Sequence, residues 1–294
     1  MIMDRIAGAP ISWGVCEVPG WGHQLAPRRV LGEMGELGLA ATEFGPDGFL
    51  PDEPEEKAEL LRSYGLRAVG GFVPAVVHDP DRDPLPGIDA ALDGFVAAGA
   101  GTLVLAAATG LDGYDERPDL DDTGWSTLFA NLDRIAERCA GRGVSLALHP
   151  HMGTLVERRE EVMRVLEGSE VPLCLDTGHL LAGGTDPVDL VRQVPRRITH
   201  THLKDVDAAL AARVRGGELS YYDAVRTGMY RPLGEGDVDI AEIVRLLEGS
   251  GYRGWYVMEQ DTVLTAEPRD EGPLADVRTG VRFLSGLDTG PAAG

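Results

Sequence analysis

The 294-residue sequence predicts a single α/β domain in which eight parallel strands, each followed by a helix, close into a (β/α)8 barrel. Short β-type runs alternate with longer amphipathic runs along the whole chain, and no linker interrupts them. Eight strand–helix pairs in just under 300 residues fit a closed barrel better than an open sheet. We therefore expect a barrel domain over residues 1–287 and a short flexible tail over residues 288–294.

The expected elements alternate strictly. Strands are predicted near residues 5–11, 40–45, 67–74, 102–108, 145–151, 172–177, 198–204 and 254–260. Helices are predicted near residues 26–38, 53–64, 87–98, 123–142, 158–168, 186–195, 239–250 and 275–286. Asp186 and Asp239 stand where helix N-caps are expected, and Gly38 and Gly99 stand where helices should end.

The longest irregular stretch covers residues 206–238, after the seventh strand. It contains a candidate helix, SYYDAVRTG, and a glycine-rich turn, LGEGD. A long segment that follows a barrel strand lies at the catalytic face, so we expect this excursion to form a lid or a pocket wall. A surface excursion without function is the alternative.

Composition narrows the class of partner. The formal net charge of −21 repels phosphate backbones and anionic membranes, so neither nucleic acid nor a membrane is an expected partner. No apolar run approaches membrane-spanning length, and the N-terminus lacks the pattern of a signal peptide. Three scattered cysteines are expected to be free thiols. These features favour a cytoplasmic enzyme with a small-molecule substrate, and a homo-oligomer is compatible with them.

Histidines carry the sharpest functional signal. Five of the seven lie at or just past the ends of the fifth, sixth and seventh strands, namely His149, His151, His179, His200 and His202. The C-terminal ends of barrel strands are where active sites form. Alternation along a strand then selects the deepest inward-facing polar residue at each strand end as a metal-ligand candidate: His149, Asp176, His202 and Glu259.

Two imidazoles and two carboxylates suit a transition metal better than Ca²⁺. We expect one divalent metal ion, Mn²⁺ or Co²⁺, with Zn²⁺, Fe²⁺ and Mg²⁺ as alternatives. Two anionic ligands would balance the ion's charge and leave positions open for substrate oxygens. Hydrogen-bonded polar groups in the core are the structural alternative for these four residues.

Three further residues at strand ends are candidates. Lys204 is one of only two lysines beside 25 arginines, and a buried lysine can exchange a proton where arginine cannot. Its neighbour Asp205 is expected to orient it. Trp13 is a candidate apolar wall against a sugar or cyclitol ring, and Glu43 a candidate proton carrier. The structural alternatives are a solvated surface position for Lys204, core packing for Trp13 and an ion pair for Glu43.

The segments LALHPHMGT, CLDTGHL, ITHTHLKDV and GWYVMEQDT resemble the inosose dehydratases of inositol catabolism, within the xylose isomerase-like superfamily of metal-dependent TIM barrels. GAPISWG, TEFGPDG and the excursion ELSYYDAVRTGMYRPLGEGDVD extend the likeness over most of the chain. The resemblance implies the same four metal ligands and a substrate-binding role for His179. It differs at Pro150, where the family often has a histidine.

The resemblance implies a dehydratase that acts on a keto-cyclitol such as 2-keto-myo-inositol, with Lys204, His151 and Glu43 as candidate acids and bases. His149 stands where sugar epimerases carry a second metal-bound glutamate, and this difference favours elimination over epimerisation. The alternatives are a keto-sugar isomerase or epimerase, or a 3-keto-glycoside lyase, that uses the same enolisation chemistry. A non-catalytic sugar-binding barrel and an endonuclease are disfavoured by the ligand set and by the net charge, respectively.

Overall fold

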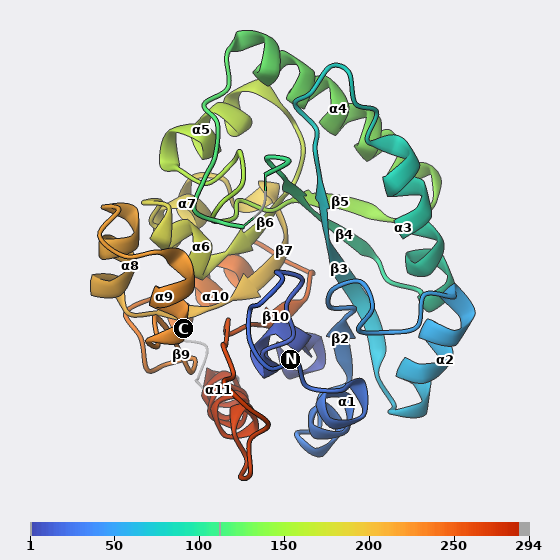
Figure 1. Cartoon of the computed structure of the whole chain (residues 1–294), viewed down its shortest axis with the longest axis vertical. Coiled ribbons are helices and arrows are strands. Elements are labelled where there is room, and N and C mark those ends of the chain that lie inside the picture. The colour runs from blue at the N-terminus through green and yellow to red at the C-terminus, as the bar shows by residue number, and fades with distance from the viewer. Residues whose placement is uncertain (1, 112, 288–294) are drawn as a thin grey trace.

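Eight parallel strands form a closed barrel in the computed structural model, which describes residues 2–111 and 113–287 (Figure 1). The barrel strands are β1 (Ile6–Gly8), β2 (Ala41–Glu43), β3 (Arg67–Ala75), β4 (Thr102–Ala107), β5 (Ser145–Leu148), β6 (Leu173–Asp176), β7 (Ile198–Leu203) and β10 (Tyr256–Met258). Each strand pairs with its neighbours in the chain, and β1 closes the ring against β10. The predicted (β/α)8 barrel is therefore confirmed.

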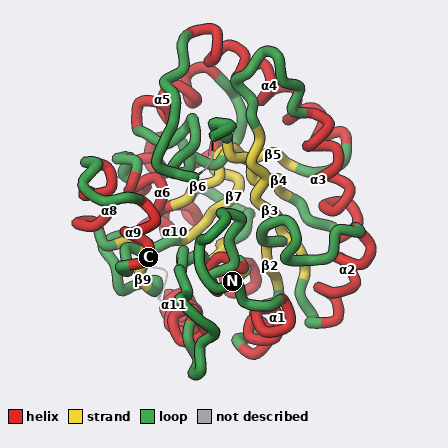
Figure 2. Tube along the Cα trace, viewed as in Figure 1, coloured by secondary structure: helices red, strands yellow, loops and turns green. Residues whose placement is uncertain are grey.

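Helices surround the strands on the outside of the barrel (Figure 2). The predicted helices correspond to α1 (Pro27–Glu36), α2 (Pro54–Ser63), α3 (Leu85–Ala98), α4 (Asp122–Gly141), α5 (Arg159–Gly168), α7 (Pro187–Gln193), α10 (Ile240–Gly249) and α11 (Pro273–Leu287). The side chains of Asp186 and Asp239 accept hydrogen bonds from the first turns of α7 and α10, as the capping pattern predicts. Residues 288–294, the predicted tail, lie outside the described residues.

The barrel interior is filled by small side chains below the strand ends. Val104, Ala147 and Cys174 form one buried cluster there. Along β5 and β6, residues two positions further on share the same face, so His149 and Asp176 lie directly above this layer. The larger leucines of the same strands point outward and pack against the helices. The packed interior thus supports a polar layer at the C-terminal end of the barrel.

The excursion after β7 is more regular than predicted. It contains a two-stranded antiparallel sheet, β8 (Asp205–Val206) with β9 (Tyr230–Arg231), and two helices, α8 (Ala208–Arg215) and α9 (Tyr221–Arg226). The short helix α6 (Thr177–Ala182), which begins directly after β6, was also not predicted. Figure 1 shows α8 and α9 beside α6, and a buried cluster that includes Trp21 and Met152 joins them to the barrel.

Among the described helices, none combines the length and the apolar character that crossing a membrane requires.

Candidate active site

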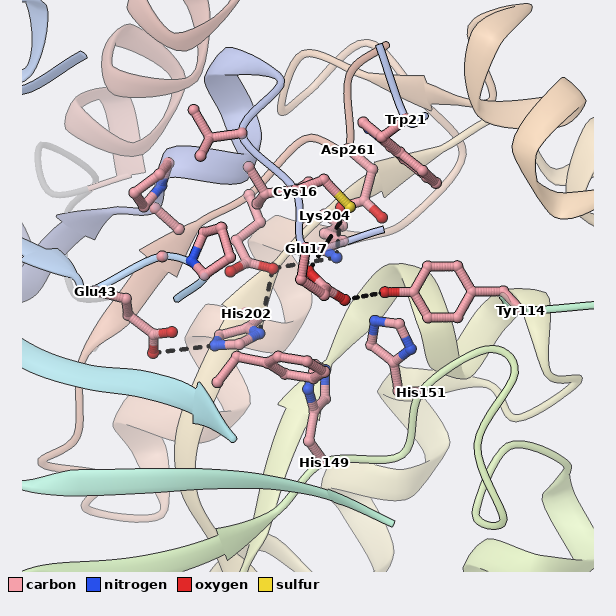
Figure 3. Close-up of a pocket in the computed structure, with 18 residues that line it drawn as sticks. Cys16, Glu17, Trp21, Glu43, Tyr114, His149, His151, His202, Lys204 and Asp261 are labelled. Carbon is pink, nitrogen blue, oxygen red and sulfur yellow. Dashed lines mark hydrogen bonds and ion pairs between the residues drawn. The ribbon is translucent and has the colours of Figure 1, made fainter. Parts of the chain in front are cut away.

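A pocket opens at the C-terminal ends of the strands and holds about 570 Å³ of empty space, its open mouth included (Figure 3). One part of its lining is apolar: Ala9, Pro10, Ile11, Val15, Trp21, Gly45, Pro46 and Phe72. The other part is polar and mostly ionisable: Cys16, Glu17, Glu43, Tyr114, His149, His151, His202, Lys204, Glu259 and Asp261. An apolar wall facing a charged floor suits a polyhydroxylated ring.

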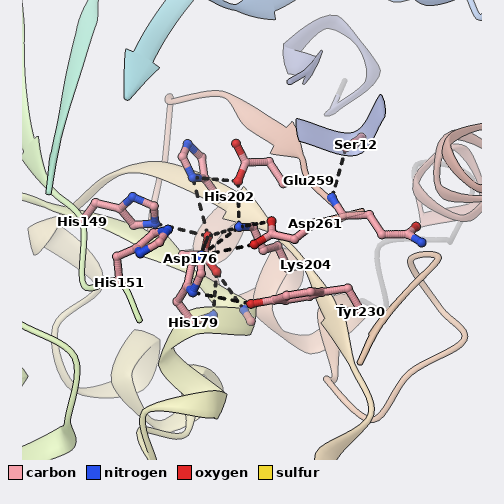
Figure 4. Close-up of polar contacts among 12 residues, drawn as sticks. Ser12, His149, His151, Asp176, His179, His202, Lys204, Tyr230, Glu259 and Asp261 are labelled. Carbon is pink, nitrogen blue, oxygen red and sulfur yellow. Dashed lines mark hydrogen bonds and ion pairs between the residues drawn. The ribbon is translucent and has the colours of Figure 1, made fainter. Parts of the chain in front are cut away.

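The four predicted ligands lie together (Figure 4), and three of them, His149, His202 and Glu259, line the pocket. The carboxylate oxygen Oδ2 of Asp176 is 3.2 Å from Nε2 of His149 and 3.6 Å from Nδ1 of His202. That same Nδ1 is 3.2 Å from Oε2 of Glu259. All four residues are buried. The ligand atoms of Asp176, His202 and Glu259 lie within 4.8 Å of one another, and those of His149, Asp176 and His179 form a second such group. Groupings of this kind fit a divalent metal site.

Lys204 is buried among acids. Its Nζ lies 2.6 Å from Asp261, 3.1 Å from Glu259 and 3.4 Å from Asp176. Burial acts to lower the pKa of Lys204, but the carboxylates of Asp176, Asp261 and Glu259 outweigh it and raise the pKa well above its usual value. Lys204 therefore carries its proton, and its charge offsets part of the negative charge of the site.

Glu43 bridges two histidines. Its Oε1 lies 2.7 Å from Nε2 of His200 and 3.1 Å from Nε2 of His202. Burial acts to raise the pKa of Glu43, but His202 and His200 lower it far below its usual value, so Glu43 is a carboxylate that accepts from both rings. The ring atom of His202 that faces Asp176 is consequently Nδ1, which makes no hydrogen bond to any described residue.

His151 and His179 both contact the main chain of Met152, whose amide donates to Nδ1 of His179 at 3.4 Å. Nδ1 of His151 lies 2.7 Å from the carbonyl oxygen of Met152, so this nitrogen donates and Nε2 of the neutral ring is left to accept. Burial lowers the pKa of His151, and Lys204 lowers it further, which keeps the ring neutral. Nε2 of His179 lies 2.9 Å from Nζ of Lys204, and His179 is not among the residues that line the pocket.

Two sequence predictions are corrected by the structure. Trp13 does not form a pocket wall, because the chain turns as a 3-10 helix (Pro10–Trp13) after β1 and buries the indole in the core. Its Nε1 donates to Glu33 of α1 at 2.7 Å. The apolar wall is supplied instead by other residues, Trp21 among them.

Asp205 does not orient Lys204. Neighbouring residues of an extended chain point to opposite sides, so the Asp205 carboxylate faces away from the pocket. It accepts hydrogen bonds from four main-chain amides of the excursion, those of Val206, Gly234, Gly236 and Val238. Its role is to hold the turn around residues 234–238.

Sequence reasoning missed several pocket residues. Asp261 follows Glu259 by two positions, so the strand alternation that selected Glu259 was a signal that could have found it. Glu17, Trp21 and Tyr114 lie in irregular loops, where no periodicity indicates the direction of a side chain. Figure 3 shows the Tyr114 hydroxyl hydrogen-bonded to the Glu17 carboxylate, which joins the loops after β1 and β4.

Comparison with known proteins defines the class. A model described as the xylose isomerase-like TIM barrel matches residues 33–286, and the chain belongs to this family. Among solved structures, IolI with a bound zinc atom superposes with a TM-score of 0.71 at 13% identity, covering 96% of this chain and 97% of that one. The 3-DHS dehydratase AsbF of Bacillus anthracis gives a TM-score of 0.67 at 14% identity, with 96% and 98% covered. At such low identities these likenesses show the fold.

Curated relatives are more specific. The rhizopine catabolism protein MocC of Rhizobium meliloti is 35% identical over 96% of this chain and 87% of its own length. The inosose dehydratase of Geobacillus kaustophilus is 34% identical over 87% of each chain. The resemblance to the inosose dehydratases is thereby confirmed, and the chain is an enzyme of this kind rather than a non-catalytic barrel.

Proposed function

We propose that the enzyme is a metal-dependent dehydratase that removes water from a keto-cyclitol such as 2-keto-myo-inositol. The observation that carries the proposal is the buried cluster of His149, Asp176, His202 and Glu259 beside the Lys204 ammonium, in a pocket with an apolar wall. The relatives named inosose dehydratase support the choice of substrate. The net charge of −21 and the acidic pocket disfavour a phosphorylated or acidic sugar.

Residues His149, Asp176, His202 and Glu259 would hold the ion. Nδ1 of His202 is buried, lies between two carboxylates and makes no hydrogen bond to any described residue, as a metal ligand should. When bound, a divalent ion supplies Lewis acidity to a ketone and its enolised form. We propose Mn²⁺ or Co²⁺ as that ion, because the ligand set mixes nitrogen and oxygen.

The reaction needs a base for the proton next to the carbonyl and an acid for the leaving hydroxyl. His151 is the better base, since its Nε2 has a free lone pair and its ring lines the pocket. We assign the acid role to Lys204, since its ammonium group can donate protons and lines the same pocket. The α C–H electrons form the enol double bond as the base takes the proton. When the β C–O bond breaks, the carbonyl re-forms, the double bond moves between the α and β carbons, and the hydroxyl leaves as water with a proton from the acid.

Glu43 fits neither of these two roles well. Its Oε1 accepts hydrogen bonds from His200 and His202, and Glu43 stays ionised. We assign it instead to orienting the His202 ring, the task that carboxylates beside metal-binding histidines perform.

The test is mass spectrometry of the enzyme incubated with 2-keto-myo-inositol in D₂O, with Mn²⁺ or Co²⁺ added. A dehydratase gives a product lighter by one water. myo-Inositol, which has no carbonyl to acidify the neighbouring proton, is the control and should remain unchanged. Deuterium uptake at constant oxygen count, without a dehydrated product, would overturn the dehydratase and favour an isomerase or epimerase.

A variant sharpens this comparison. His149→Glu places a second glutamate among the proposed ligands, as in the epimerases. We expect it to retain the metal ion, since a carboxylate also suits these ions, and to lose water elimination while allowing slow α-proton exchange. Water loss at the wild-type rate in this variant would show that residue 149 does not direct the outcome.

A further inference from the structure

Five buried side chains form a closed ring of polar contacts at the pocket, and Figure 4 labels four of them, Lys204, Asp261, His179 and Tyr230. Lys204 Nζ lies 2.6 Å from Oδ1 of Asp261, whose Oδ2 accepts from the Tyr221 hydroxyl at 2.5 Å. The Tyr221 and Tyr230 hydroxyls are 3.0 Å apart, and Tyr230 is 3.5 Å from Nδ1 of His179. Nε2 of His179 returns to Lys204 at 2.9 Å. All five residues are at most 6% exposed.

The contacts of Asp261 fix the order of donors and acceptors in one part of the ring. A carboxylate only accepts hydrogen bonds, so the Tyr221 hydroxyl donates its single proton to Asp261. It must therefore accept a hydrogen bond from the Tyr230 hydroxyl. Nδ1 of His179 lies 3.5 Å from the Tyr230 hydroxyl and also accepts from the main-chain amide of Met152 at 3.4 Å. Lys204 forms an ion pair with Oδ1 of Asp261, and its Nζ lies beside Nε2 of His179. The ring therefore sets the direction of the Lys204 ammonium.

Two of the five residues come from the excursion. Tyr221 lies on α9 and Tyr230 on β9, and neither is among the residues that line the pocket. The polar contacts of the excursion with the site pass through Asp261 and His179, and the Tyr230 ring also lies 5.4 Å from Nζ of Lys204. The Tyr221 ring is also packed, with its centroid 5.5 Å from that of Tyr114 and 6.3 Å from that of Trp21.

We propose that Asp261 is a positioning residue for Lys204, and that the Tyr221 hydroxyl holds Asp261 in the required orientation. The residues after β7 thus take part in catalysis without touching the substrate. This inference rests on the proposed function only in taking Lys204 as a group that acts on the substrate.

The first test needs no substrate. Lys57 and Lys204 are the only two lysines of the chain, so protein labelled with ¹³C at the lysine ε-carbons gives two side-chain signals. In the protein loaded with Zn²⁺, which is diamagnetic, we expect Asp261→Asn and Tyr221→Phe to move the Lys204 signal and leave the Lys57 signal in place. Tyr222→Phe is the matched control, because Tyr222 packs against Trp21 but is outside the ring. A Lys204 signal that does not move in Tyr221→Phe would overturn the proposal.

The second test is kinetic. Tyr221→Phe keeps the aromatic ring and should lower kcat about tenfold, while Asp261→Asn should lower it up to about 100-fold, the range typical of residues that orient a catalytic group. KM and bound metal should stay within twofold of the wild type. Because Tyr221 acts through Asp261, the double variant should be no slower than Asp261→Asn alone.

The outcomes separate this inference from the proposed function. If the wild-type enzyme exchanges the α-proton of the substrate but eliminates no water, the proposed dehydratase function is refuted. The same variants are then compared by their rates of α-proton exchange. A wild type that loses water, with Tyr221→Phe equally fast, refutes the positioning role alone. Two other results would also refute the positioning role, because they would indicate independent structural roles. One is a double variant in which the two losses of kcat multiply. The other is a lower melting temperature together with changes in both kcat and KM.

Discussion

Asp176 performs two tasks with its two carboxylate oxygens. Oδ1 accepts from the main-chain amides of Gly178 and His179, and so caps α6. Oδ2 faces the site, near His149, His202 and Lys204. Burial acts to raise the pKa of Asp176, but Lys204 and His179 lower it well below its usual value, so it stays ionised. A single side chain therefore connects the start of a helix to the chemistry of the site.

The separation of these tasks makes Asp176→Asn informative. The amide retains one oxygen for the cap but loses the charge that an ion requires, and Glu259→Gln makes the same change at β10. We expect each variant to lower metal affinity and turnover by at least about 100-fold and to remain folded, because stability depends mainly on the packed interior. Elemental analysis, turnover and circular dichroism measure the three quantities. Near-normal metal content in either variant would exclude that residue as a ligand.

At the scale of elements, the turn after β9 is held by one buried side chain. Asp205 lies at the start of β8, and its carboxylate accepts from the amides of Gly234, Gly236 and Val238 at 2.8–3.0 Å. A Cβ atom at Gly236 would meet Oδ1 of Asp205 at 2.3 Å, so the close approach requires glycine there. This contact closes the excursion that carries Tyr221 and Tyr230.

Asp205→Ala should release this turn. Several main-chain amides then lose their acceptor, and we expect the free energy of unfolding to fall by about 3 kcal/mol. Hydrogen exchange should accelerate at residues 232–238 and more weakly over α9, as measured by mass spectrometry. Glu235→Gln, an exposed position on the same turn, is the control and should leave exchange unchanged. Equal protection in Asp205→Ala and wild type would show that the excursion is held by its apolar contacts.

At the scale of the whole molecule, period-two alternation explains what the sequence could predict. It placed the barrel strands and brought His149, Asp176, His202 and Glu259 to one layer, because strand geometry constrains both element and side-chain direction. The alternation does not predict the direction of side chains where the chain leaves a strand. Trp13 enters the core through a 3-10 turn, and Trp21 and Tyr114 reach the pocket from loops. Tertiary packing decides such positions.

The charge of the site leads to a prediction for the intact protein. Four carboxylates are buried in the site: Glu43, Asp176, Glu259 and Asp261. Without an ion, their negative charge is offset by Lys204 and by His202. Burial acts to lower the pKa of His202, but Cys174, Glu259 and Glu43 raise it well above its usual value. A bound divalent ion would offset that charge more directly. It would also stabilise the folded state by about 2.7 kcal/mol at a concentration 100 times its Kd.

Chelation should therefore lower the melting temperature by about 5 °C and abolish turnover, since roughly 2 °C per kcal/mol is expected at this chain length. Mn²⁺ or Co²⁺ should restore both, whereas Ca²⁺, which prefers an all-oxygen shell, should restore neither. Glu259→Gln is the matched control, because it lacks one proposed ligand and its melting temperature should respond far less to either step. Full turnover in chelated protein that elemental analysis finds free of metal would end the metal-dependent mechanism and leave Lys204 and His151 to act alone.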